Sequence, residues 1–194
     1  MKTFILFTTL LLSGLAHSAT FTSKLTPDGQ NIMIMTGRID DGDDIKFKEF
    51  ITTAPDNTSN VLFLNSRGGD LNAAIMIATI LSTYDTTTVA FGSCASACAV
   101  IFSAGSKKYI PKSDLGFGEG NNRVGVHTPY VTLAGDKYEQ KPESKPWWMI
   151  YGILLANGLT KQQALLFLGK MYSTPSEGMF YIDYKSAEQY GFIN

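Results

Sequence analysis

Two residues of the chain carry the side chains that nucleophilic hydrolysis requires. Ser96 lies within "GSCASACA" (92–99), a run of small residues that follows an expected strand. At a strand-to-helix turn its hydroxyl would be exposed beside the amide of Ala97, and it becomes a nucleophile when a base accepts its proton. His127 ends the expected strand "VGVH", and imidazole is the side chain best suited to that task near neutral pH. Taken singly, the serine could be a helix cap and the histidine a structural residue.

A pair of glycines supplies a third chemical feature. Gly68 and Gly69 follow the apolar stretch "VLFLN" (61–65) and precede a helical pattern. Glycine lets a backbone approach a ligand closely, and amide groups at such a turn can stabilise a developing oxyanion. A tight turn with no further role is the alternative.

The two cysteines, Cys94 and Cys98, stand two residues to either side of Ser96. A structural zinc site takes four Cys, His or carboxylate ligands. Outside the N-terminal segment the chain has one histidine, so we expect no metal. A disulfide between residues i and i+4 forms if the backbone bends suitably, and two buried free thiols are the alternative.

The N-terminus has the pattern of a secretory signal peptide over residues 1–19. Lys2 precedes the apolar run "FILFTTLLLSGLA", and "AHSA" follows, so cleavage is expected after Ser18, with Ala16 three residues back, or after Ala19. The run is short for a membrane span, although an uncleaved anchor is the alternative. We therefore expect a periplasmic or secreted protein, in a compartment that permits disulfides.

The remaining residues, 20–194, are expected to form one domain. Their number is ample for a single core. The net charge of −1 and the 17% of charged residues give no general attraction to nucleic acid. The acidic cluster at 40–44 is expected to begin a helix and to face solvent. No cofactor is indicated.

Apolar patterns alternate between the two kinds of secondary structure, which favours an α/β fold with parallel strands. Strands are expected at 31–35, 61–65, 86–92, 108–111, 124–127 and 179–182. Helices are expected after residue 40, at 71–84, 99–105, 146–159 and 160–172, with Thr160 as an N-cap, and a short one near the C-terminus. Residues 129–146 read as an exposed polar excursion.

Four stretches in order resemble the motifs of the Clp-protease proteolytic subunit, in the wider ClpP/crotonase superfamily. They are "FLNSRGGDLNAAIMIATIL", "GSCASACAVIFSAGSKKYIPKSDLG", "GVHTP" and "SAEQYGFIN". The match runs from about residue 60 to 130 and resumes near 174–194. The resemblance implies a single-domain β-β-α superhelix, peptide or unfolded-protein substrates and a homo-oligomer. The leader and the cysteines resemble secreted, periplasmic relatives.

The resemblance also assigns roles to residues. It implies Ser96 as the nucleophile, His127 as the general base and the amides of Gly69 and Ala97 as the oxyanion hole. The family's catalytic aspartate falls at Met179 in an ungapped alignment. The expected third residue is therefore Glu177, with Asp183 as the alternative and a Ser–His dyad as a further possibility. The stretch "GFGEGNN" (116–122) lengthens the separation between serine and histidine.

These observations support a serine peptidase that forms an acyl-enzyme and works without an ATPase partner, because an exported protein has no ATP-driven unfoldase beside it. A non-catalytic binding or assembly module with the same fold is the principal alternative, and thioester chemistry of the crotonase type is a third. A Ser–Lys mechanism would need a buried lysine near Ser96, such as Lys107 or Lys108.

Overall fold

The computed structural model describes residues 18–55, 58–113 and 122–193, and its centre is one mixed sheet. Along the sheet the strands follow the order β1-β2-β3-β4-β6-β9, and β5 also pairs with β4. The pairs β2–β3, β3–β4, β4–β5 and β4–β6 are parallel, whereas β1–β2 and β6–β9 at the two ends are antiparallel. The strands are β1 (Thr20–Leu25), β2 (Gln30–Thr36), β3 (Ser59–Ser66), β4 (Thr86–Ala95), β5 (Lys107–Tyr109), β6 (Arg123–Val126) and β9 (Phe180–Asp183).

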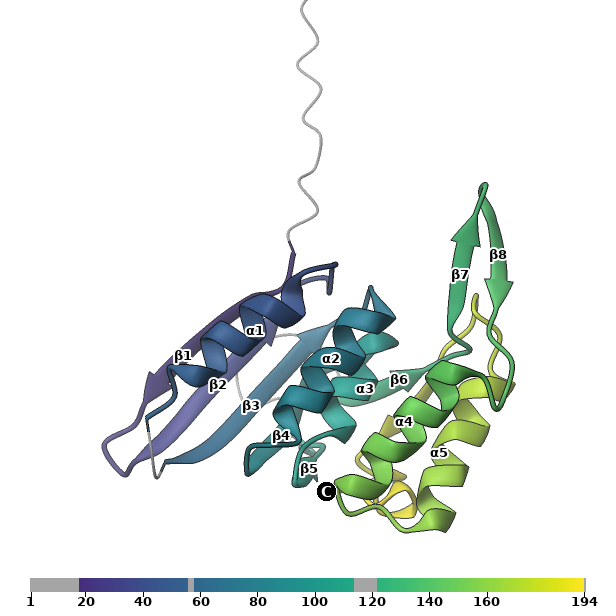
Figure 1. The fold of residues 1–194 in the computed structure, drawn as a ribbon. Coiled ribbons are helices and arrows are strands. Elements are labelled where there is room, and N and C mark those ends of the chain that lie inside the picture. Colours follow the sequence, from purple (N-terminus) through teal and green to yellow (C-terminus); the bar gives the residue numbers. More distant parts are fainter. Residues whose placement is uncertain (1–17, 56–57, 114–121, 194) are drawn as a thin grey trace, which may run out of the picture.

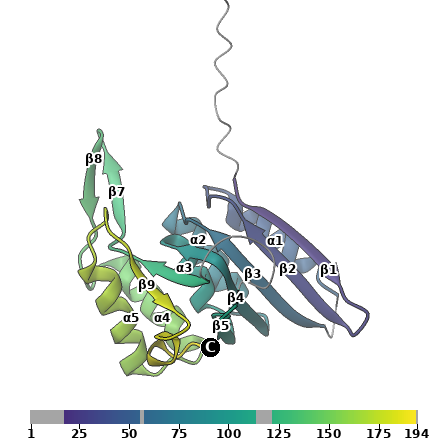
Figure 2. The ribbon, with the colours of Figure 1, turned by 180° about the vertical axis from the view of Figure 1, so that it is seen from behind.

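Three helices cover one face of this sheet (Figure 1), and the view from behind shows no helix on the opposite face of the described strands (Figure 2). They are α1 (Asp43–Thr52), α2 (Leu71–Leu81) and α3 (Ala97–Ser103). Apolar residues of α2 recur at helical spacing, and Ala74, Ile75 and Ala78 among them are buried. One side of this helix therefore packs into the core.

Two further helices, α4 (Lys145–Ala156) and α5 (Lys161–Ser173), pack side by side at the end of the sheet that holds β6 and β9 (Figure 1). Thr160 caps α5 as expected, because its Oγ1 accepts from the Gln163 amide while Gln163 Oε1 accepts from the Thr160 amide. The chain ends in a short 3-10 helix, η1 (Ala187–Tyr190).

The segment expected to be an exposed polar excursion contains regular structure. Residues 129–146 include a two-stranded hairpin, β7 (Tyr130–Leu133) and β8 (Asp136–Glu139), every residue of which is exposed. The hairpin projects from the body of the molecule (Figure 1). Exposure was thus expected correctly, and the pairing of the two strands was not foreseen.

The mixed α/β single-domain fold, consistent with the ClpP fold, is confirmed. Within the described ranges no helix is long and apolar enough to cross a membrane. The expected signal peptide lies outside those ranges except for Ser18 and Ala19, and so does "GFGEGNN" except for Asn122. The acidic cluster does begin α1, but Asp43 is fully buried, which corrects the expectation of a solvated face.

Candidate active site

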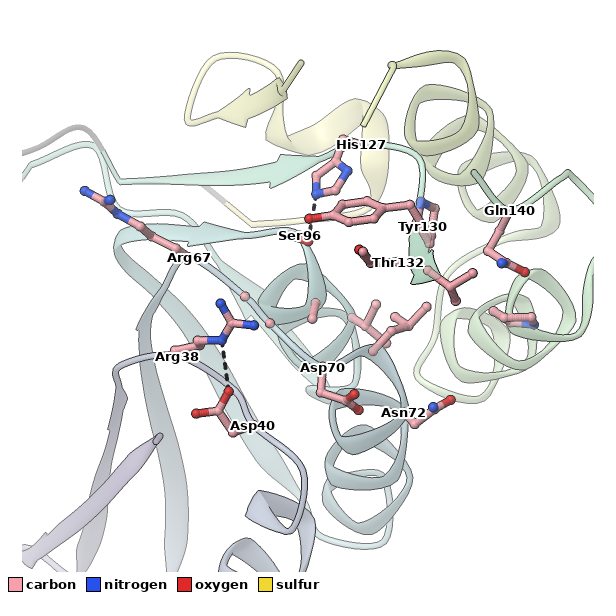
Figure 3. Close-up of a pocket in the computed structure, with 18 of the residues that line it drawn as sticks. Arg38, Asp40, Arg67, Asp70, Asn72, Ser96, His127, Tyr130, Thr132 and Gln140 are labelled. Carbon is pink, nitrogen blue, oxygen red and sulfur yellow. Dashed lines mark hydrogen bonds and ion pairs between the residues drawn. The ribbon is translucent and has the colours of Figure 1, made fainter. Parts of the chain in front are cut away.

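A pocket of about 770 Å³ opens at the carboxyl ends of the parallel strands β3 and β4 (Figure 3). Ligand sites in open α/β sheets commonly lie at this edge, where strands end and helices begin. Ser96, His127 and the glycine pair all line this pocket. The fold therefore brings together three features that the sequence separates by up to 59 positions, from residue 68 to residue 127.

Ser96 lies between the end of β4 and the first turn of α3. Its backbone has φ 56° and ψ −125°, a left-handed conformation that L-residues other than glycine adopt only under constraint. Two constraints are visible: the Ser96 amide donates to the Gly125 carbonyl (2.8 Å), and Cys94 and Cys98 form a disulfide across the serine. The result is a sharp turn that presents the hydroxyl to the pocket (Figure 3).

His127 follows directly after β6, and both ring nitrogens are engaged. Nε2 lies 2.8 Å from Ser96 Oγ, and Nδ1 lies 2.9 Å from the carbonyl oxygen of Thr128. A carbonyl can only accept, so Nδ1 must carry the proton. In the neutral ring Nε2 then has a free lone pair, and it accepts the hydrogen bond that the Ser96 hydroxyl donates. This is the tautomer that a general base for Ser96 requires.

The glycine pair holds the opposite wall of the pocket close to Ser96. Gly68 has φ +88° and Gly69 has φ +148°. A Cβ on Gly68 would lie 2.6 Å from the Ala95 carbonyl oxygen and 2.7 Å from Ser96 Cβ, and one on Gly69 would overlap the Ile39 carbonyl. Both positions therefore need glycine for conformation and for space.

Two amides beside the serine are available to a ligand. Within the described parts of the chain, neither the Gly69 N–H nor the Ala97 N–H donates to a protein acceptor. Ala97 is buried, and buried amides are nearly always paired, so an amide there that donates to no described acceptor is unusual, whereas Gly69 is exposed at the pocket. Both amides can stabilise the negative charge that develops on a carbonyl oxygen during attack.

The expected third residue is not brought to His127. The Glu177 side chain is 69% exposed and lies 3.8 Å from Lys137 Nζ in an ion pair. The alternative, Asp183, accepts hydrogen bonds from the Ser186 hydroxyl (2.9 Å) and amide (3.1 Å), which lower the pKa of its carboxyl. Asp183 does not reach the imidazole because β9 pairs antiparallel with β6, which places Asp183 opposite Arg123, at the far end of β6 from His127. Met179 does line the pocket.

The main-chain carbonyl of Thr128 takes the role expected of the carboxylate, because it accepts the hydrogen bond from His127 Nδ1. Its amide and its hydroxyl both donate to the Thr174 carbonyl, at 2.8 and 2.7 Å, just past the end of α5. These bonds fix the carbonyl that orients His127. This role could not be predicted from the sequence, because no side-chain pattern marks a main-chain acceptor.

A second unforeseen residue, Glu139 at the end of β8, interacts electrostatically with the imidazole. The Ser176 amide donates to Glu139 Oε1 (2.6 Å) and, with the Ser176 hydroxyl, lowers the pKa of this carboxyl, to which His127 adds a smaller lowering. The interaction acts through space, because the hydrogen bonds of the imidazole go to Ser96 and Thr128.

Lys108 is not placed to act as the base for Ser96. Its side chain is buried, and burial lowers the pKa of its ammonium to about 8. However, Nζ donates to the carbonyls of Gly105 (2.7 Å) and Asn157 (2.6 Å), which lie past the C-terminal ends of α3 and α4. Ser96 lies at the opposite end of α3.

Comparison of the sequence with known proteins shows to which family the chain belongs. The sequence model of the Clp protease family matches residues 17–117, just over half of the 194 residues. The matched segment includes the glycine pair and Ser96 and ends before His127. Among the curated proteins no match is found. The match, together with the fold and the geometry around Ser96, shows that the chain belongs to the Clp protease family.

Proposed function

We propose that this protein is an exported serine peptidase that cleaves peptides or loosely structured proteins through an acyl-enzyme on Ser96. The observation that carries the proposal is the 2.8 Å contact between Ser96 Oγ and His127 Nε2 beside two unpaired amides. Membership in the Clp protease family indicates peptidase chemistry, and the geometry supports particular residues for it.

The chemistry begins when Ser96 Oγ attacks the carbonyl carbon of the scissile peptide bond. His127 Nε2 takes the hydroxyl proton, and the imidazolium that forms keeps its Nδ1–H bond to the Thr128 carbonyl. The oxyanion lies against the N–H groups of Gly69 and Ala97. The leaving amine takes the proton from His127, and water then attacks the acyl-enzyme with His127 as base again.

The proposed location rests on the leader pattern of residues 1–19 and agrees with the paired cysteines. Disulfides persist mainly outside the reducing cytosol. An exported peptidase has no ATP supply, so we propose that it works without an unfoldase and therefore on chains that are already extended. Assembly into a homo-oligomer, which is typical of the family, belongs to the same proposal.

Labelling with a fluorophosphonate probe tests the nucleophile directly, because the probe reacts with a serine whose proton is removed by a base. Wild-type protein should be labelled at Ser96, as read by peptide mass spectrometry, and Ser96→Ala and His127→Ala should not be labelled. The matched control is Ser93→Ala, three residues earlier on β4, which should be labelled like wild type. A folded wild-type protein that resists the probe would instead support the non-catalytic binding module.

Substrate class is tested with the same variants. Wild-type protein should cleave short fluorogenic peptides and an unfolded protein such as a denatured casein, without ATP, while a stably folded substrate stays intact. Ser96→Ala should abolish each cleavage.

A further inference from the structure

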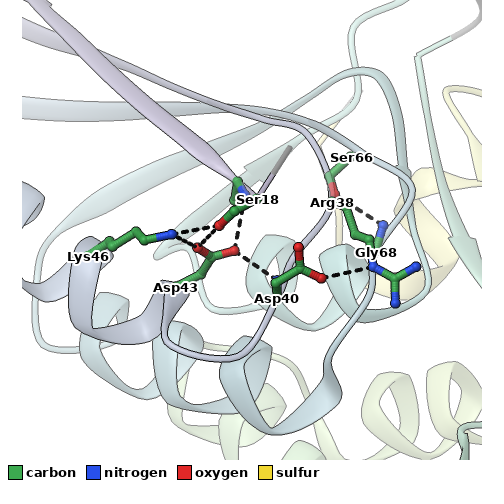
Figure 4. A network of polar contacts seen from close by, with 8 residues as sticks. Ser18, Arg38, Asp40, Asp43, Lys46, Ser66 and Gly68 are labelled. Atoms are coloured by element: carbon green, nitrogen blue, oxygen red, sulfur yellow. Dashed lines mark hydrogen bonds and ion pairs between the residues drawn. The ribbon is translucent and has the colours of Figure 1, made fainter. Parts of the chain in front are cut away.

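Asp43, the first residue of α1, has a fully buried side chain with four donors around it (Figure 4). Its oxygens accept from the Asp40 amide (2.8 Å), the Ala19 amide (3.0 Å), Lys46 Nζ (2.9 Å) and the Ser18 hydroxyl. Burial alone would raise the pKa of Asp43, but these hydrogen bonds together lower it below the ordinary value. The carboxylate is therefore negatively charged at neutral pH.

Ala19 is hydrogen-bonded to this carboxylate through its backbone nitrogen. It is only 5% exposed and belongs to the hydrophobic core. Its nitrogen is the donor to Asp43 Oδ2, and β1 begins at the next residue. The same nitrogen becomes an N-terminal amine if the chain is cut after Ser18, which is one of the two cleavage positions that the sequence indicates.

The segment 38–43 connects Asp43 to the glycine pair of the active site. Asp43 holds the amide of Asp40. The neighbouring residue, Ile39, donates its amide to the Gly68 carbonyl (3.0 Å) and accepts from the Asp70 amide (2.8 Å). Gly69 lies between these two bonds, so whatever fixes residues 38–43 also fixes the Gly69 amide. Asp40 itself lines the pocket and pairs with Arg38.

We propose that Asp43 is the binding site for the α-ammonium group of Ala19, formed by cleavage of the Ser18–Ala19 bond, and that this ion pair secures the Gly69 side of the oxyanion hole. In the cleavage water adds across the peptide bond: its hydroxyl goes to the Ser18 carbonyl carbon, its hydrogen goes to the Ala19 nitrogen, and the amine takes up a proton. An export peptidase of the host supplies this step. The proposal rests on the exported, catalytic function proposed above.

The structure distinguishes between the two cleavage positions. Cleavage after Ser18 removes the serine hydroxyl and leaves a charged donor at the place where the Ala19 amide already lies. The Ala19 amide is a neutral donor to the carboxylate, whereas an ammonium at the same place adds a direct attraction between opposite charges. Cleavage after Ala19 would remove both N-terminal donors and would leave a buried carboxylate with fewer partners, which is costly.

The first experiment locates the natural N-terminus. The complete 194-residue chain is expressed in an exporting bacterium, and the N-terminus of the secreted form is read by intact mass and peptide sequencing. We expect Ala19. An N-terminus at Thr20 or elsewhere would overturn the proposal while leaving export intact, and an uncut chain would overturn both.

The second experiment tests the ion pair and its link to the site. Two chains are released from a cleavable fusion, one starting at Ala19 and one at Ser18, each with the wild-type sequence, with Asp43→Asn or with Asp44→Asn. Asp44 is the matched control, since it is the neighbouring acid on α1 and its side chain has no hydrogen bond or ion pair with the residues that the structure describes. The readouts are the melting temperature and the rate of fluorophosphonate labelling of Ser96.

With the wild-type sequence and with Asp44→Asn, the Ala19 chain should be labelled about tenfold faster than the Ser18 chain and should melt at a higher temperature. Asp43→Asn should remove both differences. Equal behaviour of the two wild-type chains, or a difference that survives Asp43→Asn, would refute the proposal. If no chain is labelled, the peptidase function fails, and the melting temperatures still decide whether Asp43 binds the new terminus.

Discussion

Reduction of the disulfide between Cys94 and Cys98 should weaken both the fold and the nucleophile. The bond closes a loop between residues four positions apart, with Ser96 at its centre. A loop of about five residues gives a chain-entropy stabilisation of about 2 kcal/mol. We therefore expect reduction to lower the free energy of unfolding by about this amount.

The same bond restrains the unusual backbone of Ser96. A non-glycine residue at φ 56° stores on the order of 1–3 kcal/mol of strain. Without the covalent closure the turn can relax toward an ordinary conformation, which moves the hydroxyl away from His127 Nε2. Relaxation of about 1.4 kcal/mol lowers the population of the reactive arrangement, and with it the labelling rate, about tenfold.

Two measurements on oxidised and dithiothreitol-treated protein test this reasoning: urea unfolding for stability and fluorophosphonate labelling for reactivity. The double variant Cys94→Ala/Cys98→Ala is the control, because dithiothreitol should change neither of its values. If reduced and oxidised wild-type protein had equal labelling rates, the strained turn would be held by the Ser96 amide bond to Gly125 alone, and the argument would fail.

Further predictions concern three other residues. Lys108 has a pKa of about 8 in the folded protein against 10.5 ordinarily, so between these pH values the unfolded chain binds more protons and the free energy of unfolding rises with pH. In urea unfolding between about pH 7 and 9.5, the wild type should gain about 2 kcal/mol relative to Lys108→Met. A constant difference between the two proteins would contradict the burial argument. Thr128→Val, which keeps the shape but loses the hydroxyl bond to Thr174, should lower kcat about tenfold on a fluorogenic peptide with little change in KM. Thr128→Ser should restore kcat, and failure of this rescue would count against the carbonyl as the orienting group. Glu177→Gln should leave kcat/KM within about twofold of wild type, since an exposed ion pair contributes little; a large loss would show that Glu177 reaches the site.

The sequence was sufficient to predict that Ser96 and His127 would meet. Each directly follows a strand, and parallel strands carry their C-terminal residues to the same edge of a sheet. The register confirms the geometry, since β4 and β6 pair Ala95 with Gly125, which leaves the next residues of both strands at one edge. The glycine pair follows β3, which is the next strand of the same sheet.

The third group could not be predicted in this way. Its expected position depended on the register of β9, which is antiparallel, and a shift of a few residues decides which side chain faces the histidine. The acceptor proved to be a main-chain carbonyl, which every residue has. The burial of Asp43 could not be predicted from the sequence either, because four acidic residues near a helix start do not indicate which one faces the core.

Each component of the site is held by its own contact, and the three contacts lie in different parts of the fold. The segment 38–43 holds Gly69, the disulfide holds the turn of Ser96, and the end of α5 holds Thr128 and through it His127. A carbonyl acceptor stabilises an imidazolium less than a carboxylate does, because it carries no net charge. The site must therefore depend more on the exact placement of its oxyanion donors, and these are the groups that the buried Asp43 and the disulfide fix in position.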